Sequence, residues 1–247
     1  MESWEIDINC DVGEGVGNEA LLFPIISSCN VACGGHAGDA ESMIQVVRLA
    51  KEYKVKVGAH PSYPDKINFG RVVMSISEPA LKQSILEQLQ GFSTVLKSEG
   101  VTLHHIKAHG ALYNESAKNE KVARLYLETL RVFGAEVPLY VPYGSVMASM
   151  AMEAGFDVHF EAFGDRNYNT DLSLVSRKQP NALIQDPVAV LNHVLPIIKT
   201  GKIVTLSGQK TDIEAQTICI HGDTPSAFQI LMYLSEEFPK HRVAIRK

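Results

Sequence analysis

Residues 6–15 read Ile6-Asp7-Ile8-Asn9-Cys10-Asp11-Val12-Gly13-Glu14-Gly15, and they indicate the fold class. Apolar and polar side chains alternate in this stretch as far as Asp11, which predicts a strand with one apolar and one polar face. The glycines that follow predict a loop. A strand that ends in polar residues and a glycine-rich loop is typical of the first half of a βα unit, in which functional residues lie where the strand ends.

Similar short apolar runs recur along the chain and alternate with segments of helical periodicity. We expect strands at 6–10, 28–33, 55–59, 102–108, 139–141, 158–163 and 217–220, with a further strand at 202–206. Apolar spacing predicts helices around 43–50 and 191–198, and Ser77 begins a long helix that Gly100 ends. No linker interrupts the pattern, so we expect one α/β domain over residues 1–247. Seven or eight units suggest a closed barrel, and an open doubly wound sheet has the same content.

Composition narrows the class of protein. Of 247 residues, 45% are hydrophobic and 21% are charged, as in ordinary globular domains. A net charge of -5 without long basic runs gives no reason to expect a nucleic-acid partner. The N-terminus does not resemble a secretory signal, and no apolar run is long enough to span a membrane. Four cysteines without a Cys-x-x-Cys pair predict buried, reduced thiols, so we expect a cytoplasmic protein.

Residue parity predicts a polar barrel interior. Side chains on a strand alternate between two faces, and Lys107 and His109 share the face opposite apolar Ile106. The same division recurs around Glu161 and His221. Barrel interiors are usually filled by Val, Ile and Leu, so a repeated polar face indicates a hydrated or ligand-filled centre.

The polar clusters also fall where strands end, and each is followed by Gly, Pro or Asn. Active sites of βα folds lie at that edge, on the loops that leave the strands. The candidate site residues are Asn9, Asp11, Glu14, His36, His60, Arg71, Lys107, His109, Asp165 and Arg166. A guanidinium group matches a carboxylate or a phosphate in two-point contact, which favours the two arginines as substrate clamps.

Three of these residues suggest a metal site. Asp11, His60 and His109 offer a carboxylate and two imidazoles, a set suited to a hydrolytic divalent metal, and equally to hydrogen bonding and acid–base work without one. His105 lies four residues before His109 on the same strand, roughly 13 Å away at about 3.3 Å per residue, which is too far to share an ion. We therefore expect His105 to be structural.

Other hydrolase motifs are missing from the sequence. It contains no Gly-x-Ser-x-Gly and no His-Glu-x-x-His. The loop of residues 13–17 has glycines, but not at the spacing of a nucleotide-binding loop.

At these segments the chain closely resembles the LamB/YcsF family. The matching stretches are residues 7–14, 30–39, 57–65, 69–71, 107–114, 161–168 and 219–225, which together extend over nearly the whole chain. Two small departures occur. Gly35 stands where Phe is usual, and we expect it to leave a hole beside His36; Gly164 stands where Ala is usual.

The resemblance implies an irregular seven-stranded (β/α) barrel of the glycoside hydrolase/deacetylase type. It also implies a component of an ATP-dependent 5-oxoprolinase, which opens the lactam of 5-oxo-L-proline to L-glutamate together with partner subunits B and C. ATP would bind as its Mg complex, at a site on this chain or on the partner subunits.

We assign residue roles on that basis. Asp11 is expected to be a general base or metal ligand, and Lys107 and His109 to stabilise the developing oxyanion or phosphate. The expected substrate contacts are Asn9, Glu14, His36, His60, Arg71, Asp165 and Arg166. Two alternatives stay open: a stand-alone metal-dependent deacetylase or amidohydrolase acting on a sugar-like substrate, and a non-catalytic substrate-binding subunit.

Overall fold

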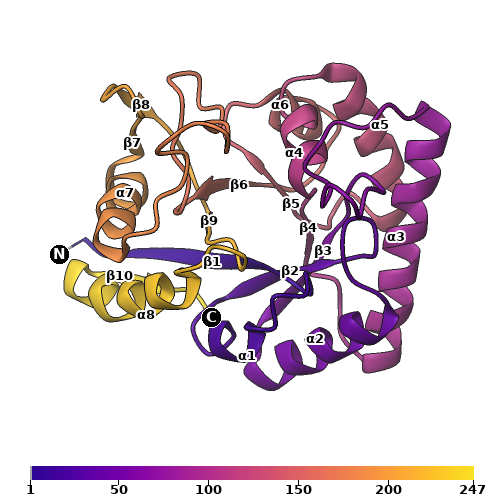
Figure 1. Cartoon of the computed structure of the whole chain (residues 1–247), viewed down its shortest axis with the longest axis horizontal. Coiled ribbons are helices and arrows are strands. Elements are labelled where there is room, and N and C mark those ends of the chain that lie inside the picture. Colours follow the sequence, from indigo (N-terminus) through magenta and orange to yellow (C-terminus); the bar gives the residue numbers. More distant parts are fainter. Residues whose placement is uncertain (1) are drawn as a thin grey trace.

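A computed structural model describes residues 2–247 and shows a closed barrel of seven parallel strands (Figure 1). Its strands are β1 (Trp4–Val12), β2 (Ser28–Ala32), β3 (Lys56–His60), β4 (His105–Ile106), β5 (Leu139–Pro142), β6 (Val158–Phe163) and β9 (Thr217–Cys219). They follow one another around the ring in that order, and β9 pairs with both β6 and β1. This closure confirms the barrel and excludes the open sheet.

The first strand is long enough to be shared. Its beginning, from Trp4 to Ile6, pairs with β10 (Val243–Ile245), while Asp7 to Asn9 pair with β9. Its other edge pairs with β2 from Asn9 to Val12. The last strand of the chain therefore extends the sheet beside β1 without entering the ring.

The helices surround the barrel (Figure 1). They are α1 (Glu19–Leu22), α2 (Ala40–Tyr53), α3 (Glu78–Glu99), α4 (Gly110–Ser116), α5 (Glu120–Leu130), α6 (Val146–Glu153), α7 (Pro187–Thr200) and α8 (Ala227–Glu237), with 3₁₀ turns at Arg131–Phe133 and Phe238–His241. Their capping residues explain their bounds. The Ser77 hydroxyl accepts from the Ala80 amide at the start of α3, and Gly100 ends it in the left-handed conformation, as predicted.

Two strand predictions need revision. The strand expected at 102–108 is reduced to β4, although backbone hydrogen bonds from His104 to Val57 and from Lys107 to Ala59 continue its alignment with β3. The strand expected around 202–206 forms β7 (Lys202–Val204), which pairs antiparallel with β8 (Lys210–Asp212) outside the barrel. That hairpin is local, so it adds no eighth strand to the ring.

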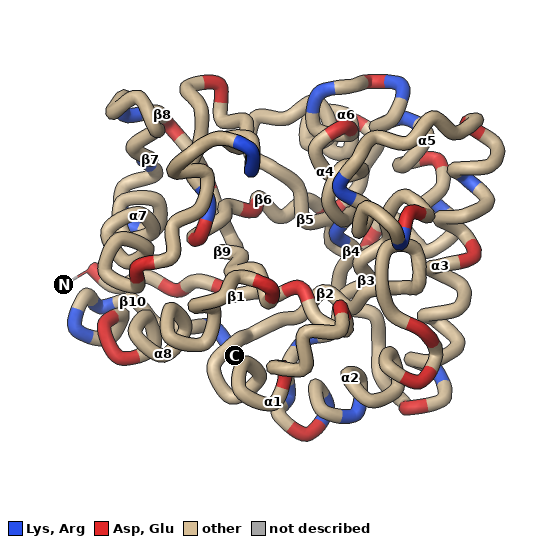
Figure 2. Tube along the Cα trace, in the orientation of Figure 1, with Lys and Arg blue, Asp and Glu red and all other residues tan. Residues whose placement is uncertain are grey.

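The two faces of the strands bury side chains of different polarity. Ile6, Ile8 and Cys10 belong to the apolar core, whereas the inward Asp7 and Asn9 are buried polar groups. Acidic residues of β1 lie in the middle of the molecule, and most other charges lie on the outer helices and loops (Figure 2). A polar interior is therefore built into the barrel, as residue parity predicted.

The lower part of this interior is filled by side chains that hydrogen-bond to one another. Asn9 Nδ2 donates to Thr217 Oγ1 at 2.7 Å, and the Thr217 hydroxyl donates to Asp7 Oδ2 at 2.6 Å. His105 Nε2 contacts Asn30 Oδ1 at 2.7 Å and lies against Gly58, where a Cβ would come within 2.2 Å of the imidazole. His105 is thus a structural residue, as its spacing predicted. Among the described residues no helix is both long and apolar enough to cross a membrane.

Candidate active site

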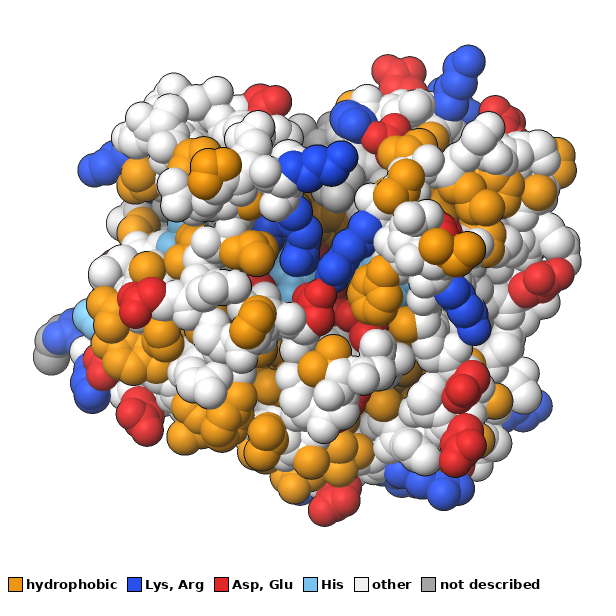
Figure 3. Space-filling model, in the orientation of Figure 1, with side chains coloured by type: hydrophobic (Ala, Val, Ile, Leu, Met, Phe, Trp, Pro, Cys, Tyr) orange, Lys and Arg blue, Asp and Glu red, His pale blue; other side chains and the backbone are white. Residues whose placement is uncertain are grey.

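A cavity of about 790 Å³ opens at the carboxyl ends of the barrel strands. Asp11, His60, Lys107 and His109 line it, and they come from three different strands and the loops that follow them. Figure 3 shows this hollow in the middle of one face, with cationic and acidic side chains gathered around it. The cavity lies at the edge of the barrel where the sequence placed the site.

Lys107 forms the floor of the cavity. Its ammonium group lies 3.0 Å from Asp11 Oδ1, 2.9 Å from Glu161 Oε1 and 3.2 Å from Cys219 Sγ, and its side chain is only 2% exposed. Burial opposes its charge, but Asp11 and the other acidic neighbours outweigh burial and raise the pKa of Lys107 well above its usual range. A permanent cation therefore lies at the base of the site.

Asp11 links Lys107 to the histidines. Its Oδ1 also accepts from Asn30 Nδ2 at 2.8 Å, and its Oδ2 lies 3.4 Å from His60 Nε2. Burial alone would raise the pKa of Asp11, yet His60 and Lys107 hold it well below its usual range. The carboxylate is thus ionised and held in one orientation.

His60 and His109 meet edge to face beside Asp11. His60 Nε2 and His109 Nδ1 are 2.9 Å apart, and the two ring planes lie at 85°. The other nitrogen of each ring faces a backbone carbonyl: His60 Nδ1 is 2.8 Å from Lys107 O, and His109 Nε2 is 2.9 Å from Phe69 O. Burial, with His36 and His60 nearby, lowers the pKa of His109 well below its usual range.

Glu14 and His36 form a layer behind His109. Glu14 Oε1 lies 2.8 Å from His36 Nε2 and 3.4 Å from His109 Nδ1, and the His36 ring stacks on that of His109 at 3.6 Å. Burial, followed by the charges of Asp11 and Asp223, raises the pKa of Glu14 well above its usual range. Burial lowers the pKa of His36 to about 2, so its ring is neutral.

Asp165 holds a further histidine at the rim of the site. Its carboxylate accepts from the His221 amide at 3.0 Å and contacts His221 Nδ1 at 2.8 Å, while the Thr224 hydroxyl donates to it at 2.6 Å. Asp165 is fully buried and does not line the cavity, whereas His221 does. The structure therefore places Asp165 behind His221.

The two candidate arginines have different partners. Arg71 pairs with Asp223 and lies over the Phe69 ring, with a third of its side chain exposed. Arg166 donates to Val175 O at 2.7 Å and is buried. Both line the cavity, but the Arg166 guanidinium is already held by backbone carbonyls.

The possible metal ligands fall into two groups. The ligand atoms of Glu14, His36, His60 and His109 all lie within 4.8 Å of one another, and so do those of Asp11, Cys219 and His221. The set expected from the sequence, Asp11, His60 and His109, is thus divided between them.

Of the other predicted residues, Asn9 is fully buried and uses its amide within the barrel, so it supports Lys107 instead of facing the cavity. Glu161, Cys219 and His221 were not among the candidates, although all three surround Lys107 or the cavity. Their parity was visible in the sequence, but parity alone does not show which inward side chains converge.

The hole expected at Gly35 does not exist. A Cβ at this position would come within 2.4 Å of both Gln88 Oε1 and Ser62 Oγ, so these two side chains occupy the space. Gln88 is held there because it accepts from the Ser62 amide at 3.0 Å and donates to Ser62 O at 2.9 Å. This expectation was wrong because the filling residue comes from α3, far along the chain from Gly35.

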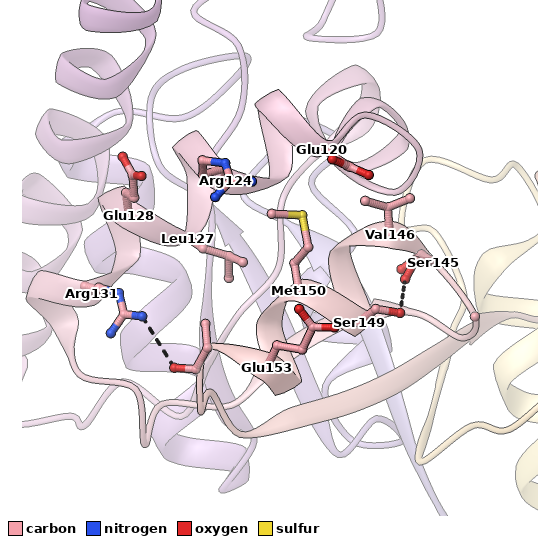
Figure 4. A pocket seen from close by; sticks show the side chains of 12 residues that line it. Glu120, Arg124, Leu127, Glu128, Arg131, Ser145, Val146, Ser149, Met150 and Glu153 are labelled. Atoms are coloured by element: carbon pink, nitrogen blue, oxygen red, sulfur yellow. Dashed lines mark hydrogen bonds between the residues drawn. The ribbon is translucent and has the colours of Figure 1, made fainter.

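A second cavity, of about 680 Å³, lies on the outside of the barrel between α5 and α6 (Figure 4). Charged side chains such as Glu120, Arg124 and Glu153 line it, and it contains none of the candidate residues. Arg131 closes one end by donating to Ala154 O at 3.5 Å. Its position away from the strand ends separates it from the candidate site.

Comparisons with known proteins give matches along nearly the whole chain. The model of the LamB/YcsF family matches residues 6–247. The chain is 38% identical to the A subunit of 5-oxoprolinase from Haemophilus influenzae (strain PittEE), over 98% of each chain. It is 40% identical to the protein of the same name from Pyrococcus horikoshii, over 97% of this chain and 96% of that one.

A solved structure is also similar. The crystal structure of the lactam utilization protein from Thermus thermophilus superposes with a TM-score of 0.91 and 36% sequence identity. The match includes 98% of this chain and 99% of that protein.

Proposed function

The chain belongs to the LamB/YcsF family, and we propose that it hydrolyses the ring amide of 5-oxo-L-proline to L-glutamate as a component of an ATP-dependent 5-oxoprolinase. One observation carries the proposal: the relatives that match along nearly the whole chain are named as the A subunit of 5-oxoprolinase. The cavity supports it, because ionised and hydrogen-bonding groups converge there at the carboxyl ends of the strands.

The chemistry requires two services from the protein. Opening a lactam places negative charge on the ring oxygen, and it needs a water molecule that loses a proton. We propose that Lys107 stabilises the oxygen, and that His109, whose ring nitrogens contact Phe69 O and His60, holds His60 beside it. Asp11 is held as a carboxylate by its 3.0 Å contact with Lys107, and an ionised carboxylate can only accept, so we propose that it orients the water and takes its proton.

The substrate carboxylate needs a cationic partner. We assign it to Arg71, because that guanidinium is partly exposed in the cavity, whereas Arg166 is held by the carbonyls of Val175 and Ala182. Arg166 then shapes the wall. His60 completes the contacts to the substrate, while Asn9 and Asp165 act from behind the lining residues.

ATP explains how a stable amide becomes reactive, because phosphorylation of the lactam oxygen creates a leaving group. No nucleotide-binding loop is present in the sequence, so we place the Mg-bound ATP on, or shared with, partner subunits B and C. We further propose a cytoplasmic location, which agrees with the four free, buried cysteines among the described residues.

The test is a reconstitution. The chain is incubated with 5-oxo-L-proline and Mg-ATP, with and without candidate partner subunits, and glutamate and phosphate are measured. We expect both products only in the full mixture. The Lys107→Met variant should lose at least about a hundredfold in rate, as removal of an oxyanion-stabilising group does, and Lys97→Met, on the surface of α3, should not.

Two results would contradict the proposal. If the complete mixture forms no glutamate, 5-oxo-L-proline is not the substrate. Release of acetate from acetylated sugars by the chain alone, without ATP, would favour the deacetylase alternative instead.

A further inference from the structure

We propose that His60, His109 and Glu14 form a binding site for one first-row divalent cation beside Asp11. The site goes beyond the reaction proposed above and does not depend on it. It rests on the way in which two imidazoles are fixed by the backbone.

Both histidine tautomers are set by backbone carbonyls. A carbonyl oxygen only accepts, so His60 Nδ1, 2.8 Å from Lys107 O, must carry a hydrogen. His109 Nε2, 2.9 Å from Phe69 O, must carry one for the same reason. In the neutral rings this leaves lone pairs on His60 Nε2 and His109 Nδ1, which face each other at 2.9 Å. Two lone pairs at that distance repel unless a cation lies between or beside them, and that cation is either a shared proton or, as we propose, a metal ion.

The pattern is that of a metal ligand pair. Histidines that bind metals almost always donate their other ring hydrogen to a carbonyl or carboxylate, as both rings do here. Two ligand atoms about 2.1 Å from one ion, at angles of about 90–110°, are about 3.0–3.4 Å apart. The 2.9 Å between the two nitrogens and the 3.4 Å between His109 Nδ1 and Glu14 Oε1 agree with this geometry.

Ring orientation decides which histidines take part. A metal lies in the plane of the imidazole that binds it, and the planes of His60 and His109 cross at 85°, so they can meet at one ion. The His36 ring is parallel to His109, at 2° and 3.6 Å, so its lone pairs cannot point at the same ion. His36 instead contacts Glu14 Oε1 at 2.8 Å and acts as a positioning residue for that carboxylate.

The charges around the site also favour a cation. The Glu14 side chain is buried with its Oε1 2.8 Å from His36 Nε2 and 3.4 Å from His109 Nδ1, and Asp11 Oδ2 lies 3.4 Å from His60 Nε2. Two imidazoles and one carboxylate suit Zn²⁺, Co²⁺ or Mn²⁺ better than Ca²⁺ or Mg²⁺, which prefer oxygen ligands. His60 and His109 line the cavity, so a remaining coordination position would face the cavity.

The test uses the full chain, stripped with a chelator and titrated with Co²⁺ alone, by calorimetry and visible absorption. We expect one Co²⁺ per chain, visible d–d bands and a higher thermal midpoint. His60→Ala, His109→Ala and the isosteric Glu14→Gln should each bind at least about 100-fold more weakly, since loss of even an outer-shell partner costs roughly 10–100-fold. Circular dichroism checks that each variant is folded.

Two controls make the assignment specific. His36→Ala should still bind one Co²⁺, about 10–100-fold more weakly, because His36 only positions Glu14. His159→Ala, a partly exposed histidine outside the cavity, should bind like the parent chain. Equal loss in His36→Ala and His109→Ala would overturn the three-ligand assignment.

Absence of bound Co²⁺, Zn²⁺ and Mn²⁺ in the folded parent chain would overturn the proposal, and the facing nitrogens would then share a proton. Binding that survives both His60→Ala and His109→Ala would overturn it as well. These results are distinct from failure of the lactam reaction, because a chain that binds Co²⁺ but yields no glutamate refutes the function and not the site.

Discussion

Asp165 illustrates how a single buried carboxylate ties stability to pH. Burial alone would raise its pKa, but the charge and hydrogen bonds of His221, with the Thr224 hydroxyl, lower it below the ordinary value of 3.8. A lowered pKa in the folded state stabilises the protein above pH 3.8, and this contribution is lost as the pH falls through the folded value. Acid should therefore weaken the rim of the cavity.

We expect Asp165→Asn to flatten this acid dependence. Urea unfolding of the parent chain between about pH 6 and about pH 3 should show a larger loss of unfolding free energy than the variant. Parallel curves for the two proteins would show that Asp165 is not the responsible group. Glu52, an exposed carboxylate of α2, offers the control Glu52→Gln.

Lys107 should be costly to remove. Because it lies between Asp11 and Glu161, Lys107→Met leaves two buried carboxylates without their cation, and such a loss costs about 3–5 kcal/mol. Glu161→Gln in the same chain should recover part of that loss, since the two groups interact directly. Denaturant unfolding of both single variants and the double variant measures the coupling, and strict additivity would contradict it.

Parity identified Lys107 and Asp11 as inward residues, and the structure places them on the floor of the cavity. Parity could not show that the Asn9 amide is hydrogen-bonded inside the barrel, because its partners, Thr217 and Glu161, lie more than 150 positions away in the sequence. A polar residue on the inward face is predictable from its own strand. Its partners, and hence its freedom to touch a substrate, are not.

At the scale of elements, replacing either of two glycines by Ala should change the stability in opposite directions. Gly91 lies within α3 with nothing within 4 Å of a Cβ, so Gly91→Ala should stabilise the protein by about 0.5–1 kcal/mol through helix propensity. Gly35→Ala places a Cβ against Gln88 and Ser62 and should destabilise it by about 1–3 kcal/mol. Thermal unfolding of the two variants measures both, and a stabilised Gly35→Ala would show that Gln88 can move aside.

Elements with their own end signals were predicted best. The helix from Ser77 to Gly100 carries its cap and its stop in its own sequence, so its bounds were correct. The strand expected at 102–108 was too long, because its length depends on which neighbours pair with it. The residues of β7 have the apolar pattern of a strand, but their partner is the neighbouring β8 and not a barrel strand. The sequence pattern of one strand does not show which strand it will pair with.

Across the whole molecule, charge is unevenly distributed. The chain has a net charge of -5, yet Arg71, Lys118, Arg177 and Lys178 gather at the cavity (Figure 3). Such a rim attracts an anionic substrate, and salt shortens the range of that attraction from about 10 Å at 0.1 M to about 3 Å at 1 M.

We therefore expect the KM of the reconstituted enzyme for 5-oxo-L-proline to rise with ionic strength while kcat changes little. Arg177→Gln should raise KM at low salt and reduce its salt dependence, and Lys97→Gln, far from the cavity on α3, should leave both unchanged. A KM that is independent of salt would show that the rim does not guide the substrate.

The alternation of strands and helices in the sequence predicts the seven-stranded ring only in part. The alternation of strands and helices predicted a parallel α/β fold in one domain, and the ring closed as expected. Which strand closes it was not visible, because β9 has three residues and the decisive pairing of Asp7 with Thr217 joins positions 210 apart.

That short strand has a consequence for how the protein is made. During synthesis the barrel cannot close until β9 has left the ribosome, so from the time β6 emerges until β9 does, the facing edges of β1 and β6 have no partner. Contacts between distant positions form slowly, and open edges invite pairing with other chains. The nascent protein is thus most vulnerable to aggregation just before β9 emerges, and its cavity, which includes His221 just beyond β9, is completed only then.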